Sequence, residues 1–448
     1  MAAPAARLRT SLSAPGLIDT LRESFSAVPD SRRKGSVRHS MTDTLGAAFA
    51  MFHLKFGSML EFDTEAHADP RLIHNLKSLY RQGTVPSDTS MREILDEVPP
   101  EALRPAFEAL HRDLQRGKAL EDFASIDGRY LLAIDGTGCF CSTKVSCPHC
   151  LVKKRSKGGG TEYSHQSVAA AIVHPDKKGQ ALMLAVEPIT NADGATKNDC
   201  EREAVKRLLD YIGTAFPNRK FLITEDALAA NGPHLEALAA HDMDFIVGVK
   251  PGNSSVFETE IMRRQSASEL VEWQDTMAAD GSTCGYRYTC AVPINASYRK
   301  LLVNYLEWWE VDKNGRQKVF TWVTNLAITA DNVIELARSA RARWRVENEV
   351  FNVLKNQGYE FGRNYGHGKK NLSSTLAALT MLAFLVDQIQ EQACRVFKQA
   401  RKRRRTKKSL WEKMRSAMEL FRIPDWETMM ALMIDPDTVD IKLDPETG

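Results

Sequence analysis

The sequence has little net charge and no long uninterrupted apolar segment. Its 60 Lys and Arg residues nearly balance its 57 Asp and Glu residues, so the formal charge of +3 does not by itself identify a partner. The most apolar segment, residues 372–386, is shorter than the roughly 20 residues needed to cross a bilayer and contains several Ser and Thr residues. It predicts a buried helix. The N-terminal residues also lack the apolar core of a secretion signal, so we expect a cytoplasmic protein with no membrane partner.

Cysteine is scarce as well. Eight cysteines in 448 residues do not form a disulfide scaffold, which favours a reducing compartment. Half of them fall in one short stretch, as Cys139, Cys141, Cys147 and Cys150. Cys147 and Cys150 have the spacing of a zinc knuckle, and His149 and His165 are nearby, so a tetrahedral Zn²⁺ site could fix this loop. The alternative is a loop that carries reduced thiols.

Positive charge is concentrated locally. Nine Lys and Arg residues lie between positions 395 and 408, and five of them are consecutive: Arg401, Lys402, Arg403, Arg404 and Arg405. A smaller cluster consists of Arg32, Arg33, Lys34 and Arg38. Such clusters suit a polyanion such as nucleic acid, although a solvated helix face has the same composition.

The chain is too long for one compact core, so we expect two or three domains. The predicted fold class is α/β, with a helical region before the α/β core and a β-rich insertion within it. The predicted segments are a helical N-terminal DNA-binding region (1–125), the first part of the core (126–252), the insertion (253–328), the second part of the core (329–395) and a basic helical tail (396–448).

Apolar periodicity predicts the elements of these segments. The strands of the core are expected at residues 130–134, 167–173, 181–189, 221–224 and 245–249, and its helices at 201–216, 234–241, 329–355 and 372–395. The strands of the insertion are expected at residues 286–292, 301–311 and 319–326. In the N-terminal region a helix should begin after residue 86, capped by Ser87 or Asp88. It could be a recognition helix or part of a plain helical bundle.

Two acidic residues follow buried strands of the predicted core. Asp135 comes after Leu-Leu-Ala-Ile and Asp226 after Phe-Leu-Ile-Thr-Glu. In open α/β sheets the functional crevice lies outside the carboxyl ends of the strands, so both aspartates should face the same crevice. A third acidic residue near them would complete a set of metal ligands.

The third candidate is Glu347. At 100° per residue it shares a helical face with Trp344 and Val350, whereas Glu349 points to the other side and resembles an ordinary surface acid. An acid on an apolar face must be paired, protonated or bound to a metal. A salt bridge from Glu347 to Arg343, one turn earlier, is the alternative explanation.

Three carboxylates close together would hold one or two Mg²⁺ ions, or Mn²⁺. Two such ions can activate a water or a 3′-hydroxyl and stabilise the leaving oxygen of a phosphodiester. Asp135, Asp226 and Glu347 therefore indicate phosphoryl transfer.

At this point the sequence resembles a known family, the DDE transposases of bacterial insertion sequences, which have an RNase H-like catalytic domain with a β-rich insertion. The resemblance rests on Ala133-Ile-Asp-Gly-Thr, on Thr224-Glu-Asp-Ala-Leu-Ala-Ala-Asn-Gly-Pro-His, on Arg343-Trp-Arg-Val-Glu-Asn-Glu-Val-Phe-Asn-Val-Leu-Lys and on Asn364-Tyr-Gly-His-Gly. It covers about residues 125–395.

The resemblance implies that Asp135, Asp226 and Glu347 are catalytic metal ligands, and that Arg343 and Lys355 lie near the DNA backbone or the catalytic acid. It also implies transposon-end DNA and target DNA as partners, and a homodimer in the DNA complex, associated with the nucleoid.

The chain departs from the family signature at two points. Ala340 stands where a Tyr is common, and the spacing from Glu347 to Lys355 is one residue longer than the commonest version. The role of Lys355 is therefore less firmly implied, and Glu349 remains a second candidate for the acid.

The insertion also carries aromatic candidates. In relatives with such an insertion, an aromatic residue there can stack on a flipped base, and Trp308, Trp309 and Trp322 could do so here. The alternative is that they belong to the core of the β-rich insertion.

Other functions use parts of the same pattern. An RNase H-like nuclease without strand transfer would need the same carboxylates. A non-catalytic DNA-binding derivative of a transposase would have no reason to keep all three acids. A zinc-dependent hydrolase using the cysteines would lack a general-base motif such as HExxH.

Overall fold

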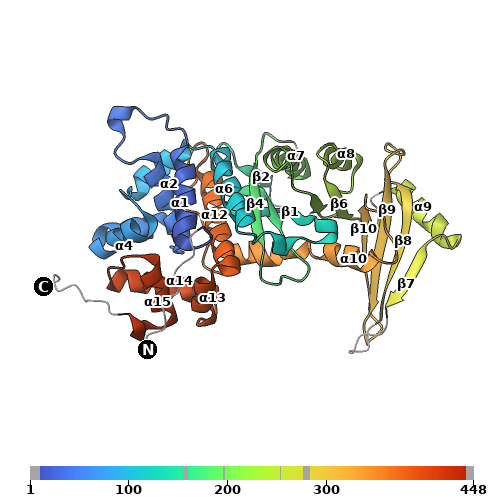
Figure 1. Cartoon of the computed structure of the whole chain (residues 1–448). Coiled ribbons are helices and arrows are strands. Elements are labelled where there is room, and N and C mark those ends of the chain that lie inside the picture. Colours follow the sequence, from blue (N-terminus) through green and yellow to red (C-terminus); the bar gives the residue numbers. More distant parts are fainter. Residues whose placement is uncertain (1–10, 155–159, 195–196, 253, 276–282, 440–448) are drawn as a thin grey trace.

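The molecule is elongated, with a mixed sheet between a helical lobe and a projecting β-rich unit (Figure 1). The computed structural model describes residues 11–154, 160–194, 197–252, 254–275 and 283–439. Residues 253 and 276–282 of the predicted insertion and 440–448 of the predicted tail lie outside this description. The predicted α/β fold with a helical N-terminal region is confirmed.

The sheet has ten strands within the described residues, and its centre is built from the predicted core strands. Strand β1 (Tyr130–Ser142) runs parallel to β5 (Phe221–Thr224), which runs parallel to β6 (Asp244–Gly248). On its other side β1 pairs antiparallel with β3 (Thr161–Ile172), which also pairs with β4 (Leu182–Ile189). A short strand that was not predicted, β2 (Leu151–Lys154), pairs with β3.

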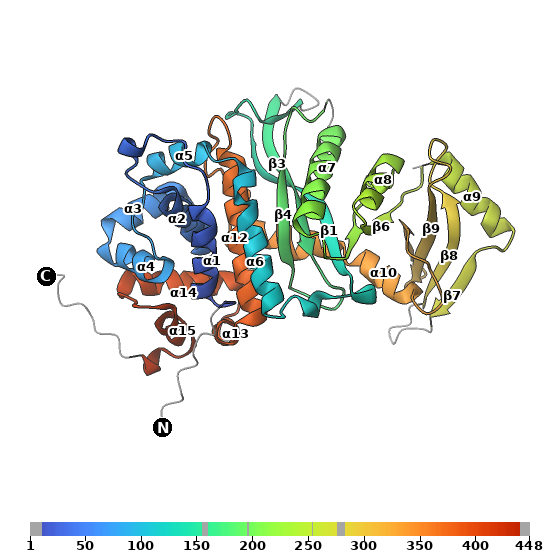
Figure 2. The ribbon, with the colours of Figure 1, turned by 45° about the horizontal axis from the view of Figure 1, so that its top comes forward.

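Helices cover the central strands, which explains why those strands are apolar along nearly their whole length. Helix α7 (Lys197–Ala215) contacts β3 and β4, and α8 (Gly232–Ala240) contacts β6. Helices α6 (Arg104–Arg116) and α12 (Leu372–Ala393) pack against β4 from the side of the helical lobe (Figure 2).

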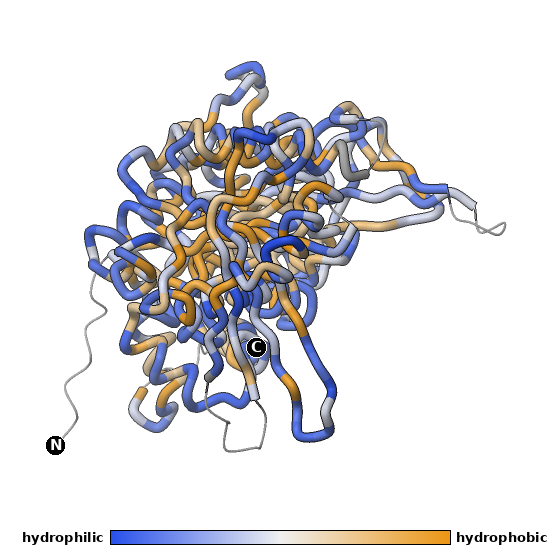
Figure 3. The backbone as a smooth tube through the Cα atoms, turned by 90° about the vertical axis from the view of Figure 1, so that its right-hand side faces the viewer, coloured by the Kyte–Doolittle hydropathy of each residue, from blue (hydrophilic) through white to orange (hydrophobic). Residues whose placement is uncertain are grey.

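The β-rich segment continues the same sheet. Strand β10 (Gln317–Thr324) pairs antiparallel with β6, and β9 (Leu302–Val311), β8 (Thr283–Pro293) and β7 (Val271–Asp275) follow in order. Helix α9 (Ser255–Ser266) packs on β8. Neither α9 nor β7 was predicted. The tube in Figure 3 shows the apolar segments gathered in the middle of the molecule and polar hairpins projecting from it.

The helical lobe contains both the N-terminal and the C-terminal helices. They are α1 (Ala14–Ser26), α2 (Met41–His53), α3 (Met59–Ala68), α4 (Pro70–Tyr80), α5 (Asp88–Asp96), α13 (Arg395–Lys402), α14 (Lys407–Leu420) and α15 (Trp426–Ile434). Asn75 of α4 donates from Nδ2 to the carbonyl oxygens of Met418 and Phe421, each at 2.8 Å. The basic tail therefore packs on the N-terminal helices.

The start of α5 agrees with the prediction. The Ser87 hydroxyl oxygen accepts a hydrogen bond from the backbone N–H of Ser90, and Met91, Ile94 and Leu95 are buried. This places α5 inside the lobe.

Helix α12 has 22 residues and covers nearly all of the helix predicted at residues 372–395. By length and composition this helix could cross a membrane, although its most apolar segment, residues 372–386, is shorter than the roughly 20 residues that a span needs. The expectation of burial is confirmed, because 94% of its apolar window lies inside the protein. It also carries Asp387, whose carboxylate pairs with His53 at 3.0 Å and Lys55 at 2.7 Å in the lobe. A buried carboxylate that is paired with a buried lysine is typical of a protein core.

Candidate active site

Asp135 and Asp226 lie beside each other because their strands are parallel neighbours. The parallel pairing of β1 with β5 ends at Ala133 and Thr224, and each acid follows shortly after. Asp135 is not at the end of its strand, as the sequence predicted, because β1 continues along β3 to Ser142. Its carboxylate accepts the N–H of Gly136, and that of Asp226 accepts the N–H of Leu228, both at 2.8 Å.

The two aspartates line an open cleft of about 640 Å³. Polar and charged side chains form most of its wall, among them Gln166, Glu201, Arg202, Asn231, Lys250 and Asn295. Arg202 and Lys250 are exposed, so the cleft presents positive charge near the aspartates.

Arg343 brings Glu347 to the same site. Its Nη1 lies 3.0 Å from Oδ2 of Asp135, and its Nη2 lies 2.8 Å from Oε1 of Glu347. The ion pair that stood as the alternative explanation for Glu347 is therefore present. The same guanidinium also pairs with Asp135, so the ion pair of Glu347 does not separate this residue from the candidate catalytic acids.

The helix that carries Glu347 is not the continuous helix that was predicted. Helix α10 (Val333–Arg341) is followed by a π-helical segment, Val346–Phe351, and then by α11 (Asn352–Asn356). A π-helix advances fewer degrees per residue than the 100° used to assign the faces, so that assignment fails here.

The exposed fractions of three side chains show where the assignment of helical faces fails. Trp344, expected on the apolar face, is 50% exposed. The Glu347 side chain is 39% exposed and that of Glu349 only 15%, the reverse of the prediction. Glu349 pairs instead with Arg345 at 3.4 Å. Glu347 is thus linked to Asp135 through Arg343, and not through burial on an apolar face.

The electrostatics of Asp135 reflect this cluster. Burial raises its pKa to about 6, the charge of Arg343 and the Gly136 N–H oppose the rise, and the negative charges of Glu347 and Asp226 add to it. Crowded carboxylate oxygens of this kind are hard donors that suit Mg²⁺ or Mn²⁺. The chemistry of these donors therefore suits a divalent cation, although in the described part of the chain the three carboxylates do not form a group whose ligand atoms all lie within 4.8 Å of one another.

Two further groups at the site were not predicted. Glu201 approaches Gly136, where an added Cβ would lie 3.0 Å from the glutamate oxygen, so the glycine leaves room for this acid. Behind Asp226, the buried Glu225 accepts a 2.6 Å hydrogen bond from His234. Burial lowers the pKa of His234, but the charge and hydrogen bond of Glu225 more than offset this and raise it. The sequence offered no periodic signal for Glu201, which lies far from Asp135 in the chain.

The family model described as the transposase DDE domain matches residues 127–385, more than half of the chain. The chain belongs to this family. The matched region begins just before β1 and ends within α12, so it contains Asp135, Asp226 and Glu347 as well as the β-rich segment. The comparison with curated proteins gives no match.

In this DDE transposase the structure brings together two of the four predicted cysteines and separates the other two from them. Cys147 and Cys150 lie together with His165 and with His367, whose ligand atoms are all within 4.8 Å of one another. Cys139 and Cys141 are not in this group. The thiol of Cys139 is buried and contacts the His165 carbonyl oxygen at 3.5 Å, and Cys141 is exposed on β1. His149 is exposed in the same loop.

The tryptophans of the transposase occupy different environments. Trp308 and Trp309 lie on opposite faces of β9, as strand alternation predicts. Trp308 is 5% exposed and lies under the Arg341 guanidinium, 4.1 Å from its ring centre. Trp322 is buried as well, whereas Trp309 is partly exposed.

The basic residues that were predicted to contact DNA also lie in different environments. Lys355 is exposed on α11. In the tail, Lys402, Arg403 and Arg405 are exposed, while Arg401 donates to the carbonyl oxygen of Arg404 at 2.8 Å. This basic run belongs to the helical lobe of the transposase and does not line the cleft.

Proposed function

We propose that this transposase cleaves the ends of a transposon and joins them to target DNA, with Asp135, Asp226 and Glu347 as the ligands of Mg²⁺ or Mn²⁺. The observation that carries the proposal is the shared guanidinium of Arg343, which holds Asp135 and Glu347 around one point while Asp226 adds its charge nearby. When bound, the metal ions would supply the positive charge that activates a water or a 3′-hydroxyl and stabilises the leaving oxygen.

The residues of the chain prepare the cleft for this chemistry. The N–H groups of Gly136 and Leu228 orient the two aspartates. Arg343 offsets the repulsion among the acids and lowers the pKa of Asp135, which favours its ionised, ligating form. The exposed Lys250 and Arg202 in the cleft wall can contact phosphate oxygens of the DNA backbone. Lys355, exposed on the helix that follows Glu347, is a further candidate contact.

The test is cleavage of DNA that carries the ends of the element encoding this chain. With Mg²⁺ present, the wild-type protein should cut at the ends and join them to a target plasmid. Asp135→Ala, Asp226→Ala and Glu347→Ala should each abolish cutting while end binding survives. Glu349→Ala is the matched control: it changes the acid paired with Arg345 and should retain measurable cleavage.

The products separate the proposal from its alternative. Cut ends that are never joined to target DNA would identify a nuclease without strand transfer. An active Glu347→Ala variant beside an inactive Glu349→Ala variant would reverse the assignment of the third acid. Because synapsis of two ends normally requires two protomers, we also propose that the active complex is a homodimer on DNA.

A further inference from the structure

Four side chains from three separate segments converge at one point beside the catalytic sheet. Cys147 and Cys150 lie in the loop between β1 and β2, His165 lies on β3, and His367 lies in the loop before α12. Cys150 and His367 are 217 positions apart in the sequence. Chain proximity therefore does not account for the group.

The spacing of the ligand atoms matches a tetrahedral zinc site. With Zn–S near 2.3 Å and Zn–N near 2.0–2.1 Å, the ligand atoms of such a site lie about 3.8 Å apart for two sulfurs and about 3.6 Å for sulfur and nitrogen. The Sγ atoms of Cys147 and Cys150 are 3.7 Å apart. The Nε2 atom of His165 lies 3.2 Å and 3.5 Å from these sulfurs, and Nδ1 of His367 lies 3.8 Å from Cys150 Sγ.

We propose that Cys147, Cys150, His165 and His367 bind one structural Zn²⁺ ion. Two thiolates and two imidazoles are donors that zinc prefers, and a set of four protein ligands leaves no open position for a substrate. This site is chemically distinct from the cluster of carboxylates, whose hard oxygen atoms suit Mg²⁺.

The surrounding structure holds the ligands in place before any metal binds. The backbone N–H of Cys147 donates to Cys150 Sγ at 3.3 Å, and this hydrogen bond fixes the turn that carries both cysteines. Asn191 donates from Nδ2 to the carbonyl oxygen of Pro148 at 2.8 Å and so anchors the same turn. The pairing of Leu151 with Ser164 sets this turn against β3, next to His165.

His367 is presented by a loop clamped to the helical lobe. It stands between Gly366 and Gly368, and Gly368 has a φ of +63°, which favours glycine. An added Cβ at Gly368 would meet the Asp96 carboxylate of α5 at 2.1 Å, so the loop and α5 are in close contact.

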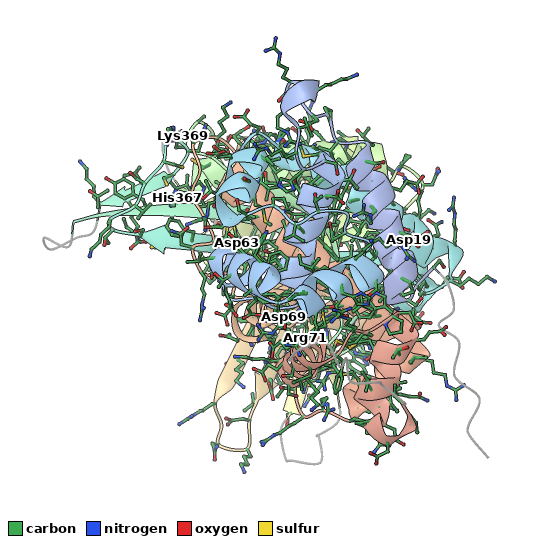
Figure 4. The ribbon with its side chains drawn as sticks, turned by 90° about the vertical axis from the view of Figure 1, so that its left-hand side faces the viewer. Asp19, Asp63, Asp69, Arg71, His367 and Lys369 are labelled. Carbon is green, nitrogen blue, oxygen red and sulfur yellow. The ribbon has the colours of Figure 1, made fainter. Side chains whose placement is uncertain are left out.

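Asp96 also fixes the start of α12. Its carboxylate accepts four backbone N–H groups between 2.8 and 3.0 Å, those of Lys369, Lys370, Asn371 and Leu372. Figure 4 shows His367 and Lys369 where this loop reaches the projecting strands of the sheet.

The proposed site joins two segments that leave the candidate active site. β1 carries Asp135 and leads to the cysteine turn, and the segment with Glu347 and Lys355 leads to His367. A zinc ion would cross-link them and tie the sheet to the helical lobe. Because closing a long loop restricts the unfolded chain, the ion should raise the stability of the whole protein.

The experiment is a measurement of metal content in the full-length protein, purified without chelator from cells supplied with zinc. We expect about one equivalent of zinc per chain by mass spectrometry of the metal. X-ray absorption at the zinc edge should give two sulfur ligands near 2.3 Å and two nitrogen ligands near 2.0–2.1 Å. Cys147→Ser and His367→Ala should lose the zinc and melt at lower temperature.

Two variants are matched controls. His149→Ala changes the exposed histidine of the same turn, and Cys141→Ser changes the exposed thiol of β1. Both should keep one equivalent of zinc and the wild-type melting temperature.

Several outcomes would overturn the proposal. They are wild-type protein without zinc, a disulfide between Cys147 and Cys150 in its place, or zinc that persists in His367→Ala. If a ligand variant does not fold, Co²⁺ added to the chelator-treated wild-type protein decides the question. A tetrahedral cobalt spectrum with thiolate charge-transfer bands supports the site, and an octahedral spectrum contradicts it. None of these readouts depends on transposase activity.

Discussion

Burial has the largest effect on the pKa of the Asp135 carboxyl group, and the charges of one arginine and two other acids modify it. Burial raises its pKa from the ordinary value of 3.8 to about 6, despite the opposing charge of Arg343. Between these two values the folded protein keeps a proton that the unfolded chain has released. The metal-free protein therefore loses stability as pH rises from about 4 to about 6, and the loss is complete above that range.

This predicts that Asp135→Asn stabilises the protein in the absence of divalent metal. In EDTA the variant should melt at a higher temperature than the wild type above pH about 7, because the amide carries no charge that burial penalises. The difference should shrink as pH falls through about 6 and vanish near pH 4. Thermal melts across this range measure it. Asp331→Asn, at an exposed position, is the control and should show no such trend. A difference independent of pH would contradict the argument.

Single residues differ in how far sequence could identify them. Asp135 and Asp226 could be selected as candidates because each follows an apolar segment, and the pairing of β1 with β5 places them beside each other. His367 and Glu201 were missed because only the folded chain brings them to the cysteines and to Gly136. Glu347 was selected on a premise about its helical face that is wrong, and its link to Asp135 through Arg343 is a tertiary contact.

At the scale of elements, long periodic segments were predicted well and local changes of helix geometry were not. The five core strands and helices α7, α8 and α12 form where apolar periodicity placed them. The π-helical segment Val346–Phe351 has no apolar signature, but it explains a departure noted in the sequence. A π-helical turn accommodates one extra residue within an α-helix, and the spacing from Glu347 to Lys355 is one residue longer than the commonest version.

We therefore predict that deleting Asn348, an exposed residue of the π-helical segment, is tolerated. The deletion should convert this segment to regular α-helix and leave Val350 and Leu354 in their buried positions. Inserting one Ala after Asn348 should be far more harmful, because a second extra residue rotates α11 and everything after it by about 100°. Melting temperature and end cleavage measure both effects. Equal damage from the deletion and the insertion would show that the π-helical segment does not absorb the extra residue.

The two faces of strand β9 lead to another prediction. Trp309 is partly exposed and so is the better candidate to stack on an unpaired base, an interaction worth about 1–3 kcal/mol. If the cut ends pass through a DNA hairpin, in which a base is flipped out, Trp309→Ala should spare the first nick and slow the later formation of the hairpin by roughly 5- to 150-fold. Trp308→Ala should instead destabilise the fold by about 3–5 kcal/mol, because it empties a buried site beneath Arg341.

Time courses of nicked and hairpin products, together with melting curves, separate these effects. If Trp309→Ala slows both steps equally, the stacking residue lies elsewhere or no hairpin forms. Trp344→Ala should be measured alongside, since Trp344 is 50% exposed and its ring centre lies 5.3 Å from the Arg343 guanidinium. If Trp344→Ala slows only the later step, the residue that stacks on the unpaired base is Trp344, beside Arg343, and not a residue of the β-rich segment.

On the scale of the whole molecule, the cleft lies between two units that could each contact DNA. The helical lobe carries the basic run, residues 401–405 at the end of α13 and just after it, at one end of the molecule, and β7–β9 project at the other (Figure 1). The run was recognisable from composition, but its packing was not. Nε of Arg401 lies 3.8 Å from a carboxylate oxygen of Glu391 on α12, and Nη1 of Arg401 donates a hydrogen bond to the carbonyl oxygen of Arg404. Arg401 therefore makes contacts within the helical lobe. Lys402, Arg403 and Arg405 remain exposed.

The salt dependence of end binding tests whether these exposed charges contact DNA. Each phosphate contact made by Lys or Arg contributes about −0.9 to the slope of log affinity against log salt, because bound counterions are released. Replacing Lys402, Arg403 and Arg405 by Gln should therefore make the slope shallower by up to about 2.7. Binding titrations at several salt concentrations measure it. A variant that neutralises Lys313 and Arg316 in the turn between β9 and β10, and Lys318 at the start of β10, removes the same charge at the other end of the molecule. An unchanged slope in the tail variant would place residues 402–405 away from the DNA, and equal changes in both variants would indicate an effect of net charge alone.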